Sequence, residues 1–532
     1  MSMLQRSRFI RRAGAAGLVL AAAASLLVAC GGGGGGSGGS VACTAAPAVD
    51  GPVWWLFGRD AQHAAVAAVE TQPLERLVWR TAVDLAPQYT SSGALLIHYG
   101  SPLVTARNTV IVPVKTGTAG GFRVEARQGH DGCLLWSQAS DYLLPPHRWV
   151  PSFNPALAPS GERLFVPTSG GRVIIRDDPD SATGTTRTVA FYGNAAYDAA
   201  PATYDANVVI NTPLTVDANG TVFFGFTVLG ANPAGLVGGI ARIASDGTGA
   251  WVSAATAAGD AAIVKTATNS APALSADGAT LYVAVNTVGG TGLRPSGYLL
   301  ALDSATLATR AAAPLLDPAL GTAAWVSDDA TSSPTVGPDG DVFLGVLEAS
   351  VPSHNYRGWL LHFDAALGTS KTPGAFGWDT TASIVPASMV PSYTGPSSYL
   401  LATKYNNYGG AGTGDGKNRL AVLDPAQTQA DAISGEPVML EVLTMLGPTP
   451  DPNYPGGVLE WCINTMAVDP LTSSILVNNE DGKLYRWDLR TNSFTQQIAL
   501  TSGLAAAYTP TAIGPDGRVY AINNATLFSV GR

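Results

Sequence analysis

Short runs of alternating apolar and polar residues recur along the chain, and many of them open with a glycine-containing turn. Runs of this kind, rich in Val, Leu, Phe and Tyr, are typical of β-strands in a packed sheet. The clearest copies follow the turns Ser160-Gly161, Asn219-Gly220, Asp277-Gly278, Asp339-Gly340 and Asp516-Gly517. An Asp-Gly or Asn-Gly turn before an alternating run is a strong hairpin signal. Because no amphipathic segment of helix length accompanies these runs, the pattern predicts an all-β protein.

The turns are evenly spaced, which predicts a repeat architecture. The intervals from Gly161 to Gly220, Gly278 and Gly340 are 59, 58 and 62 residues, and Gly517 follows 177 residues later. The long interval is about three periods, so it holds two degenerate repeats. Further copies are found at residues 398–401, 473–477 and 101–112. The chain therefore contains eight repeats, with seven as the alternative count.

Each repeat contains enough strands for one blade of a β-propeller. A second hairpin recurs downstream of each glycine turn, for example at Gly297–Asp303 and Gly358–Asp364. Four short strands per repeat without helices predict an eight-bladed β-propeller of four-stranded blades. The last repeat ends at Phe528–Val530 without an outer strand, and Leu74–Arg80 is an unassigned strand near the N-terminus. We expect this N-terminal strand to close the ring, since closure leaves fewer edges unpaired.

The N-terminus has the features of a secretory signal. Four arginines, the last at Arg12, precede an uncharged apolar run that ends in Leu27-Val28-Ala29-Cys30. This ending looks like a bacterial lipobox, and the resemblance implies cleavage before Cys30 and lipidation of that cysteine. An uncleaved transmembrane anchor is the alternative, but the run is short for a span and dominated by Ala and Gly.

A glycine-rich tether separates the signal from the repeats. Residues 31–40 are almost entirely Gly with two Ser, a composition that stays flexible. We therefore divide the chain into a signal peptide (1–29), a lipidated cysteine with its tether (30–50) and one propeller domain (51–532). Gly31 follows Cys30, and by resemblance to sorted lipoproteins this favours the outer membrane, facing the periplasm.

Charge and cysteine content narrow the functional classes. The formal charge is −9, and removal of the signal makes it −13. An acidic surface argues against nucleic-acid binding, which requires clustered Lys and Arg. Once Cys30 is lipidated, Cys43, Cys133 and Cys462 remain, and three thiols cannot all pair within one chain. Their pairing stays open, and no Cys-x-x-Cys motif supports a redox or zinc site.

The segment Trp55–His63, together with the repeat itself, resembles the PQQ-like (quinoprotein-type) eight-bladed propellers. Trp136 and Trp251 occupy the place of the tryptophans that dock one blade on the next in that family. The family contains dehydrogenases that bind pyrroloquinoline quinone (PQQ) and Ca²⁺ on the axis, and lipoprotein scaffolds that assist outer-membrane protein assembly. The dehydrogenases resemble one another in an adjacent cysteine pair and a calcium ligand set. This sequence has neither, so it looks more like the scaffolds and no cofactor is predicted.

Two segments are candidate ligand-binding sites. Tyr405, Asn406 and Asn407 begin a polar, glycine-rich hairpin tip, whose aromatic residues could stack on a ligand. Glu460, Trp461 and Asn464 precede an inner strand and could point into the axial funnel. The alternatives are a flexible loop for the first segment and packing of Trp461 against a neighbouring blade for the second.

No catalytic residue or metal site is predicted. The histidines are scattered, with no pair at metal-binding spacing. The sequence therefore favours a non-catalytic binding or scaffolding propeller, anchored to a membrane by lipid and bound to other envelope proteins. The alternative is an enzyme that uses the axial funnel, either a PQQ-dependent oxidoreductase or a Ca²⁺-dependent hydrolase.

Overall fold

The computed structural model describes residues 43–532 except 89–98, 119, 147–152, 288–294, 329–331, 351–352, 503 and 505. The signal segment and Cys30 lie outside the described residues. Within the described part, no helix is both long and apolar enough to cross a bilayer.

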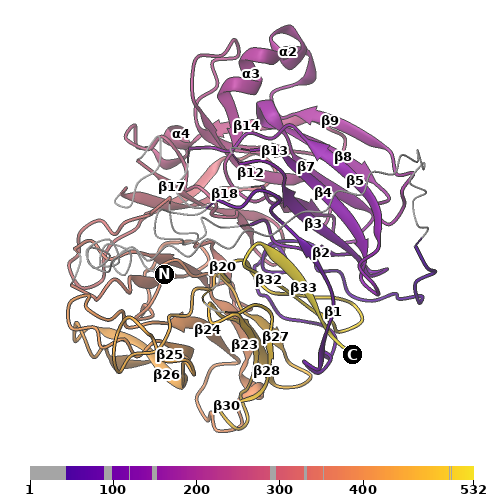
Figure 1. Cartoon of the computed structure of the whole chain (residues 1–532). Helices are drawn as coiled ribbons and strands as arrows, with labels where there is room; N and C mark the ends of the chain where they lie inside the picture. The colour runs from indigo at the N-terminus through magenta and orange to yellow at the C-terminus, as the bar shows by residue number, and fades with distance from the viewer. Residues whose placement is uncertain are drawn as a thin grey trace, which may run out of the picture.

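The described chain forms eight antiparallel sheets arranged in a ring, which is a β-propeller (Figure 1). The predicted eight blades are confirmed, and the alternative of seven is wrong. In chain order, the strands of blades 1 to 4 are β2 (Leu103–Val104), β3 (Thr109–Lys115), β4 (Phe122–Gln128), β5 (Leu134–Ser140); β6 (Ala156–Leu157), β7 (Arg163–Pro167), β8 (Arg172–Asp177), β9 (Thr186–Ala190); β10 (Val208–Ile210), β11 (Thr215–Val216), β12 (Val222–Val228), β13 (Gly239–Ile243), β14 (Gly249–Ser253); and β15 (Lys265–Thr266), β16 (Ala273–Leu274), β17 (Thr280–Asn286), β18 (Gly297–Asp303), β19 (Thr309–Pro314).

Blades 5 to 8 complete the ring. Their strands are β20 (Thr335–Val336), β21 (Val342–Val346), β22 (Trp359–Phe363); β23 (Ser383–Pro386), β24 (Tyr399–Tyr405), β25 (Arg419–Ala430), β26 (Pro437–Leu446); β27 (Ala467–Asp469), β28 (Ser474–Asn478), β29 (Lys483–Asp488), β30 (Ser493–Ala499); and β31 (Ala512–Ile513), β32 (Val519–Asn523), β33 (Thr526–Gly531), β1 (Arg76–Ala82). Blade 5 has three regular strands, and its outer position is taken by residues 370–374, which bridge to Leu360 and Phe363.

The ring is closed by strands from both ends of the described chain, as predicted. β1 pairs antiparallel with β33, from Arg76 opposite Gly531 to Ala82 opposite Thr526. Figure 1 shows the early strand β1 beside the C-terminal strands β32 and β33. Trp79 of β1 also packs on Tyr520 of β32, with ring centroids 5.8 Å apart. The stability of the whole ring therefore depends on the N-terminal strand β1, which pairs with the edge of the last blade.

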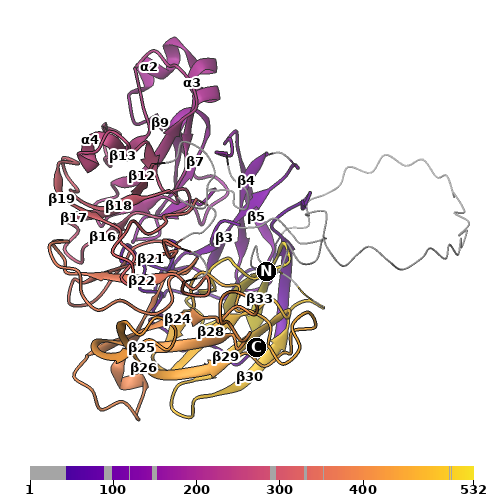
Figure 2. The same cartoon turned by 90° about the vertical axis from the view of Figure 1, so that its left-hand side faces the viewer.

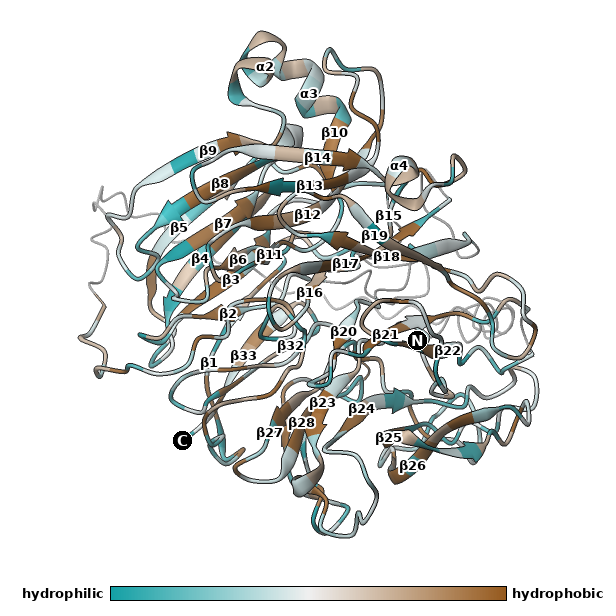
Figure 3. Cartoon of the chain, turned by 180° about the vertical axis from the view of Figure 1, so that it is seen from behind, coloured by the Kyte–Doolittle hydropathy of each residue, from teal (hydrophilic) through white to brown (hydrophobic). Residues whose placement is uncertain are grey.

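The five glycine turns that defined the repeat each connect the inner strand of a blade to the next strand. Gly220 has a φ of +78°, a left-handed conformation that glycine adopts without strain. Asp217 accepts hydrogen bonds from the N–H groups of Asn219 and Thr221, which fixes the same turn. The strands that follow are buried, and Figure 3 shows them as apolar segments joined by more polar connections.

Three short helices depart from the expectation of a helix-free chain. They are α2 (Asn194–Ala199), α3 (Pro201–Asn207) and α4 (Ala254–Ala258), and all three lie in connections between blades. They are rich in alanine, which has the highest helix propensity, and Pro201 occupies the first turn of α3. Figure 2 shows α2 and α3 projecting beyond the strands.

The antiparallel order of the strands gives the ring two distinct faces. We call the lower face the one that carries the glycine turns, and the upper face the one where the inner strands begin. The lower face is covered by residues 51–72. Backbone hydrogen bonds link this segment to the inner strand or inner turn of seven blades, through residues Val104, Leu157, Leu274, Val336, Ile384, Val468 and Gly517. The motif Trp55–His63 therefore forms part of a cover over the lower end of the axis.

A disulfide joins Cys43 to Cys133, which settles the pairing that the sequence left open, and Cys462 takes no part in it. Cys133 precedes β5 at the lower edge of blade 1. The disulfide thus attaches the start of the described chain to the outer part of that blade.

Candidate functional site

A belt of hydrogen bonds runs around the upper end of the axis and joins every blade to the next. It is built mostly from polar residues just before the inner strands, and four of these residues, Ser101, Asn154, Ser333 and Thr509, directly precede a proline. The bonds are Ser101 N to Asn154 Oδ1, Leu214 N to Asn154 O, Asn269 N to Asn211 O, Ala271 N to Ser333 Oγ, Ser333 N to Thr381 Oγ1, Thr381 N to Asn464 O, Asn464 N to Tyr508 O and Thr509 Oγ1 to Tyr99 O. The upper end of the axis is therefore rigid and lined by polar groups.

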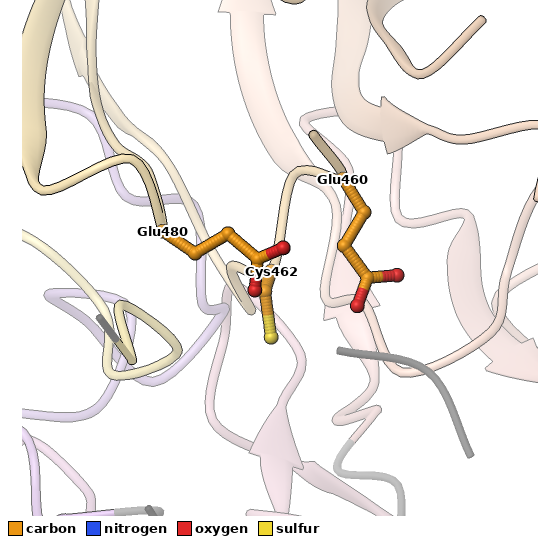
Figure 4. Close-up of side chains that lie close together, drawn as sticks. All are labelled: Glu460, Cys462 and Glu480. Atoms are coloured by element: carbon orange, nitrogen blue, oxygen red, sulfur yellow. The ribbon is translucent and has the colours of Figure 1, made fainter. Parts of the chain in front are cut away.

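Three side chains of the types that can bind metal ions converge beside this belt, between blades 6 and 7. Glu460 and Cys462 lie on the connection from β26 to β27, and Glu480 lies in the turn from β28 to β29 (Figure 4). Their carboxylate oxygens and the Cys462 Sγ all lie within 4.8 Å of one another. Glu460 and Glu480 are buried, whereas Cys462 is partly exposed. We call these three residues the axial acidic cluster.

The surroundings shift the pKa values of this cluster. Burial raises the pKa of Glu480 to about 7, and the neighbouring carboxylate of Glu460 acts in the same direction. Burial also raises the pKa of the Cys462 thiol to about 11, again with a contribution from the two glutamates. Burial penalises the charged forms of the Glu480 carboxyl and the Cys462 thiol, and the raised pKa values favour their neutral forms.

Two buried ion pairs lie around the same end of the axis. Lys404 Nζ is 3.2 Å from Asp379 Oδ2, and Lys265 Nζ is 2.6 Å from Asp328 Oδ2. Lys265 also donates to Thr268 Oγ1 and Asn286 Oδ1, which gives its ammonium a full set of partners. These lysines are therefore held by their own blades.

The structure brings the two sequence-predicted segments together. Asn406 Nδ2 donates to the carbonyl of Trp461, and the Trp461 N–H donates to Asn406 Oδ1. Trp461 is fully buried and packs on Tyr485 and Phe494 of blade 7. The centroid of each of these rings lies 5.9 Å from that of the Trp461 ring. Asn406 and Trp461 thus position the connection that carries Glu460.

The remaining predicted residues lie in different surroundings. Asn464 belongs to the belt, and its Nδ2 donates to Tyr508 Oη. Tyr405 donates to Glu441 Oε1 on β26. Asn407 donates to Asp415 Oδ1 and accepts from Asn355 Nδ2 of blade 5. Only Glu460 of the six predicted residues contributes a side chain to the axial acidic cluster.

The upper face also carries most of the exposed apolar side chains. Among the described residues, twelve large apolar side chains are exposed, and nine of them lie on or beside the connections that emerge at the upper face. These nine, which we call the upper rim, are between 39% and 52% exposed: Leu85, Leu143, Leu229, Val237, Val264, Leu316, Leu320, Leu446 and Leu504. Only Leu77, Leu134 and Leu471 lie toward the lower face.

Sequence reasoning missed Glu480, Cys462 and the upper rim as parts of the site. Glu480 lies in an Asn-Glu-Asp-Gly turn whose preceding strand was recognised, but a turn residue carries no signal of which residues from a neighbouring connection lie beside it. The sequence did carry a signal for the hydrogen-bond belt, because Ser, Thr or Asn stands before Pro at the start of several inner strands.

Comparison with known proteins supports the fold class. The sequence matches no protein-family model and no curated protein significantly. A europium-containing methanol dehydrogenase has a similar structure, with a TM-score of 0.55 and 13% identity over 88% of this chain and 89% of that one. A quinohemoprotein alcohol dehydrogenase from Comamonas testosteroni gives 0.53 and 12% over 90% and 81%. BamB from Moraxella catarrhalis gives 0.43 and 12% over 86% and 99%. At these identities the likeness to the two dehydrogenases shows the β-propeller fold alone.

The described residues do not fit the PQQ group of the dehydrogenases. The family resemblance implies an adjacent cysteine pair over the cofactor, but the described disulfide joins Cys43 to Cys133 at the outer edge of blade 1. The axial acidic cluster offers a thiol between two carboxylates, and Ca²⁺ prefers ligands that are all oxygen.

Proposed function

We propose that this chain is an exported lipoprotein of the bacterial cell envelope, anchored through lipid on Cys30, whose propeller binds other envelope proteins through its upper face. The observation that supports it is the upper rim. Large apolar side chains that are exposed to solvent and gathered on one surface favour protein association. The lower face is covered by the protein's own residues 51–72, so it offers less free surface.

The disulfide supports the same orientation. Because Cys43 is attached to Cys133 at the lower edge of blade 1, the lipidated tether would leave the domain on the lower side. A domain held from that side presents its upper face away from the anchor.

Photo-crosslinking in intact cells tests this proposal. A photoreactive phenylalanine analogue is placed at Leu316 on the upper rim, and at Leu471 near the lower face as the matched control. We expect a discrete crosslinked protein from position 316 and none from position 471. Equal crosslinking from both positions, or none from either, would contradict binding through the upper face. Lipidation is tested separately by Cys30→Ala, which should release the protein from the membrane fraction.

A metal-dependent enzyme is the second candidate function, and the axial acidic cluster is the observation that favours it. Carboxylate and thiolate ligands together suit a borderline ion such as Zn²⁺ better than Ca²⁺. Elemental analysis of the purified protein separates this candidate from protein binding.

A further inference from the structure

A groove on the lower face lies between blades 3 and 4, beside the cover formed by residues 51–72. Its volume is about 410 Å³. Small-ligand sites typically have volumes of about 300–1,000 Å³. The walls come from the cover and from the two blades, and they include Trp55, Gln62, Asp217, Arg242, Asp277 and Ser304. The groove is therefore large enough for a small molecule, and its walls are both aromatic and charged.

The groove offers three hydrogen-bond acceptors that no described residue uses. Asp217 and Asp277 each fix their own turn through Oδ1, so their Oδ2 atoms make no hydrogen bond to a described residue. Gln62 donates through Nε2 to two backbone carbonyls of blade 4, which leaves its Oε1 without a donor in the described chain. Hydrogen bonds from Ser275 and Ala279 lower the pKa of Asp277, so this carboxylate is charged at neutral pH.

The same groove also contains hydrogen-bond donors without acceptors. The indole Nε1 of Trp55 and the Nε of Arg242 are buried and have no partner among the described residues. Arg242 donates through Nη1 to the Ser304 carbonyl at 3.2 Å, and its Nη2 makes no hydrogen bond within the described chain. Buried donors in folded proteins are nearly always paired. These donors therefore favour an acceptor supplied by a ligand at the groove wall.

This mixed set of groups distinguishes between classes of ligand. A cation would meet the guanidinium of Arg242, and an anion would meet the carboxylates of Asp217 and Asp277. A hydroxyl group carries no charge and both donates and accepts, so it suits carboxylates and guanidinium alike. The partly exposed ring of Trp55 adds an apolar surface, against which the C–H groups of a sugar ring can pack. A ligand with several hydroxyls and an apolar face therefore matches the groove best.

We propose that this groove binds a neutral carbohydrate of about the size of a disaccharide. One sugar ring packs on Trp55, hydroxyl groups donate to the carboxylates of Asp217 and Asp277, and another hydroxyl accepts from Arg242. The groove lies on the lower face, whereas the upper rim lies on the opposite face. Carbohydrate binding is therefore independent of the proposed protein binding, and either can fail without the other.

Isothermal titration calorimetry on the mature protein tests this inference. The probes are the neutral disaccharides cellobiose, maltose and N,N′-diacetylchitobiose, and we expect at least one of them to bind. Chitobiose, which carries free ammonium groups where diacetylchitobiose carries neutral amides, should bind no more tightly than its neutral parent. Tighter binding of chitobiose would assign the groove to a cation and overturn the inference. Absence of binding by all three neutral probes at millimolar concentration would also overturn it.

Two variants connect the binding to this groove. Asp277→Asn keeps the Oδ1 acceptor of the turn and removes the charge, and it should weaken binding about tenfold, because hydrogen bonds to charged groups are the stronger ones. Trp55→Ala should weaken binding by a similar factor, with its melting temperature measured as the control for folding. The matched control is Asp246→Asn, in an Asp-Gly turn of blade 3 on the same face, outside the groove lining. Unchanged affinity in either groove variant that folds, or an equal loss in Asp246→Asn, overturns the inference.

Discussion

Asn464 makes two hydrogen bonds to Tyr508, one from its backbone N–H to the carbonyl at 3.0 Å and one from Nδ2 to the hydroxyl at 2.8 Å. These bonds join blade 7 to blade 8 at the upper end of the axis, next to the axial acidic cluster. The residue that the sequence marked as a ligand candidate is therefore also part of the belt that holds the ring together.

Removal of the Tyr508 hydroxyl should destabilise the ring. In Tyr508→Phe the buried Asn464 amide loses an acceptor, which costs about 1–3 kcal/mol in the free energy of unfolding. Chemical denaturation measures the loss. A double variant with Asn464→Ala should lose less than the sum of the two single variants, since both residues share the interaction. Strict additivity would show that the two side chains act independently.

Loss of the Cys43–Cys133 disulfide should lower stability because it closes a segment of 90 residues in sequence. That segment contains both β1 and residues 51–72, so it includes the ring closure and the cover of the lower face. We expect Cys133→Ser to lower the free energy of unfolding by about 2–4 kcal/mol. The matched control is Cys462→Ser, which removes a thiol that takes no part in the disulfide. A reducing agent should lower the melting temperature of the wild-type protein and leave that of Cys133→Ser unchanged.

Acidification should weaken the cover of the lower face through His63. This side chain is fully buried, its Nδ1 lies 2.7 Å from the Pro334 carbonyl, and burial lowers its pKa to about 4. Between about pH 6.5 and 4 the unfolded state binds a proton that the folded state does not. Stability is therefore lost as the pH falls through this range, by up to about 3 kcal/mol. His63→Gln should show a smaller difference in stability between pH 7 and pH 4.5; an unchanged difference would exclude His63 as its source.

Alkylation of Cys462 should be slow although the thiol is partly exposed. The thiolate is the reactive form, and a pKa of about 11 leaves on the order of 0.1% of it at pH 8. Glu480→Gln should speed alkylation by iodoacetamide, because it removes a nearby negative charge that raises the pKa of the thiol. The pH dependence of the rate distinguishes a pKa change from simple opening of the site, which would raise the rate equally at every pH.

The blades were predictable because their signals are local. A turn such as Asp277-Gly278 and the alternating strand after it are set by neighbouring residues, so their spacing yields the number of blades. The closing strand could also be predicted, because the last repeat lacks an outer strand and Leu74–Arg80 was unassigned. The short helices were missed because each is only one or two turns long, too short for a periodic pattern.

The site was predicted only in part, because it depends on contacts between distant residues. Glu460 was identified from its position before an inner strand, whereas its neighbour Glu480 comes from the following hairpin. The sequence allowed Trp461 either to line the axial funnel or to pack against a neighbouring blade. Its orientation toward Tyr485 depends on how blade 7 packs, which the local sequence does not determine. The role of residues 51–72 as a cover involves seven blades at once, which no local pattern encodes.

Metal and cofactor content tests most directly whether this propeller is a protein-binding module or an enzyme. The mature protein is purified without chelators, its elements are analysed, and its melting temperature is measured with and without Zn²⁺, Ca²⁺ and PQQ. Protein binding through the upper face predicts no stoichiometric metal and no rise in melting temperature with any of the three. One bound metal per chain, or a clear rise in melting temperature with PQQ, would contradict it and favour the enzyme candidate.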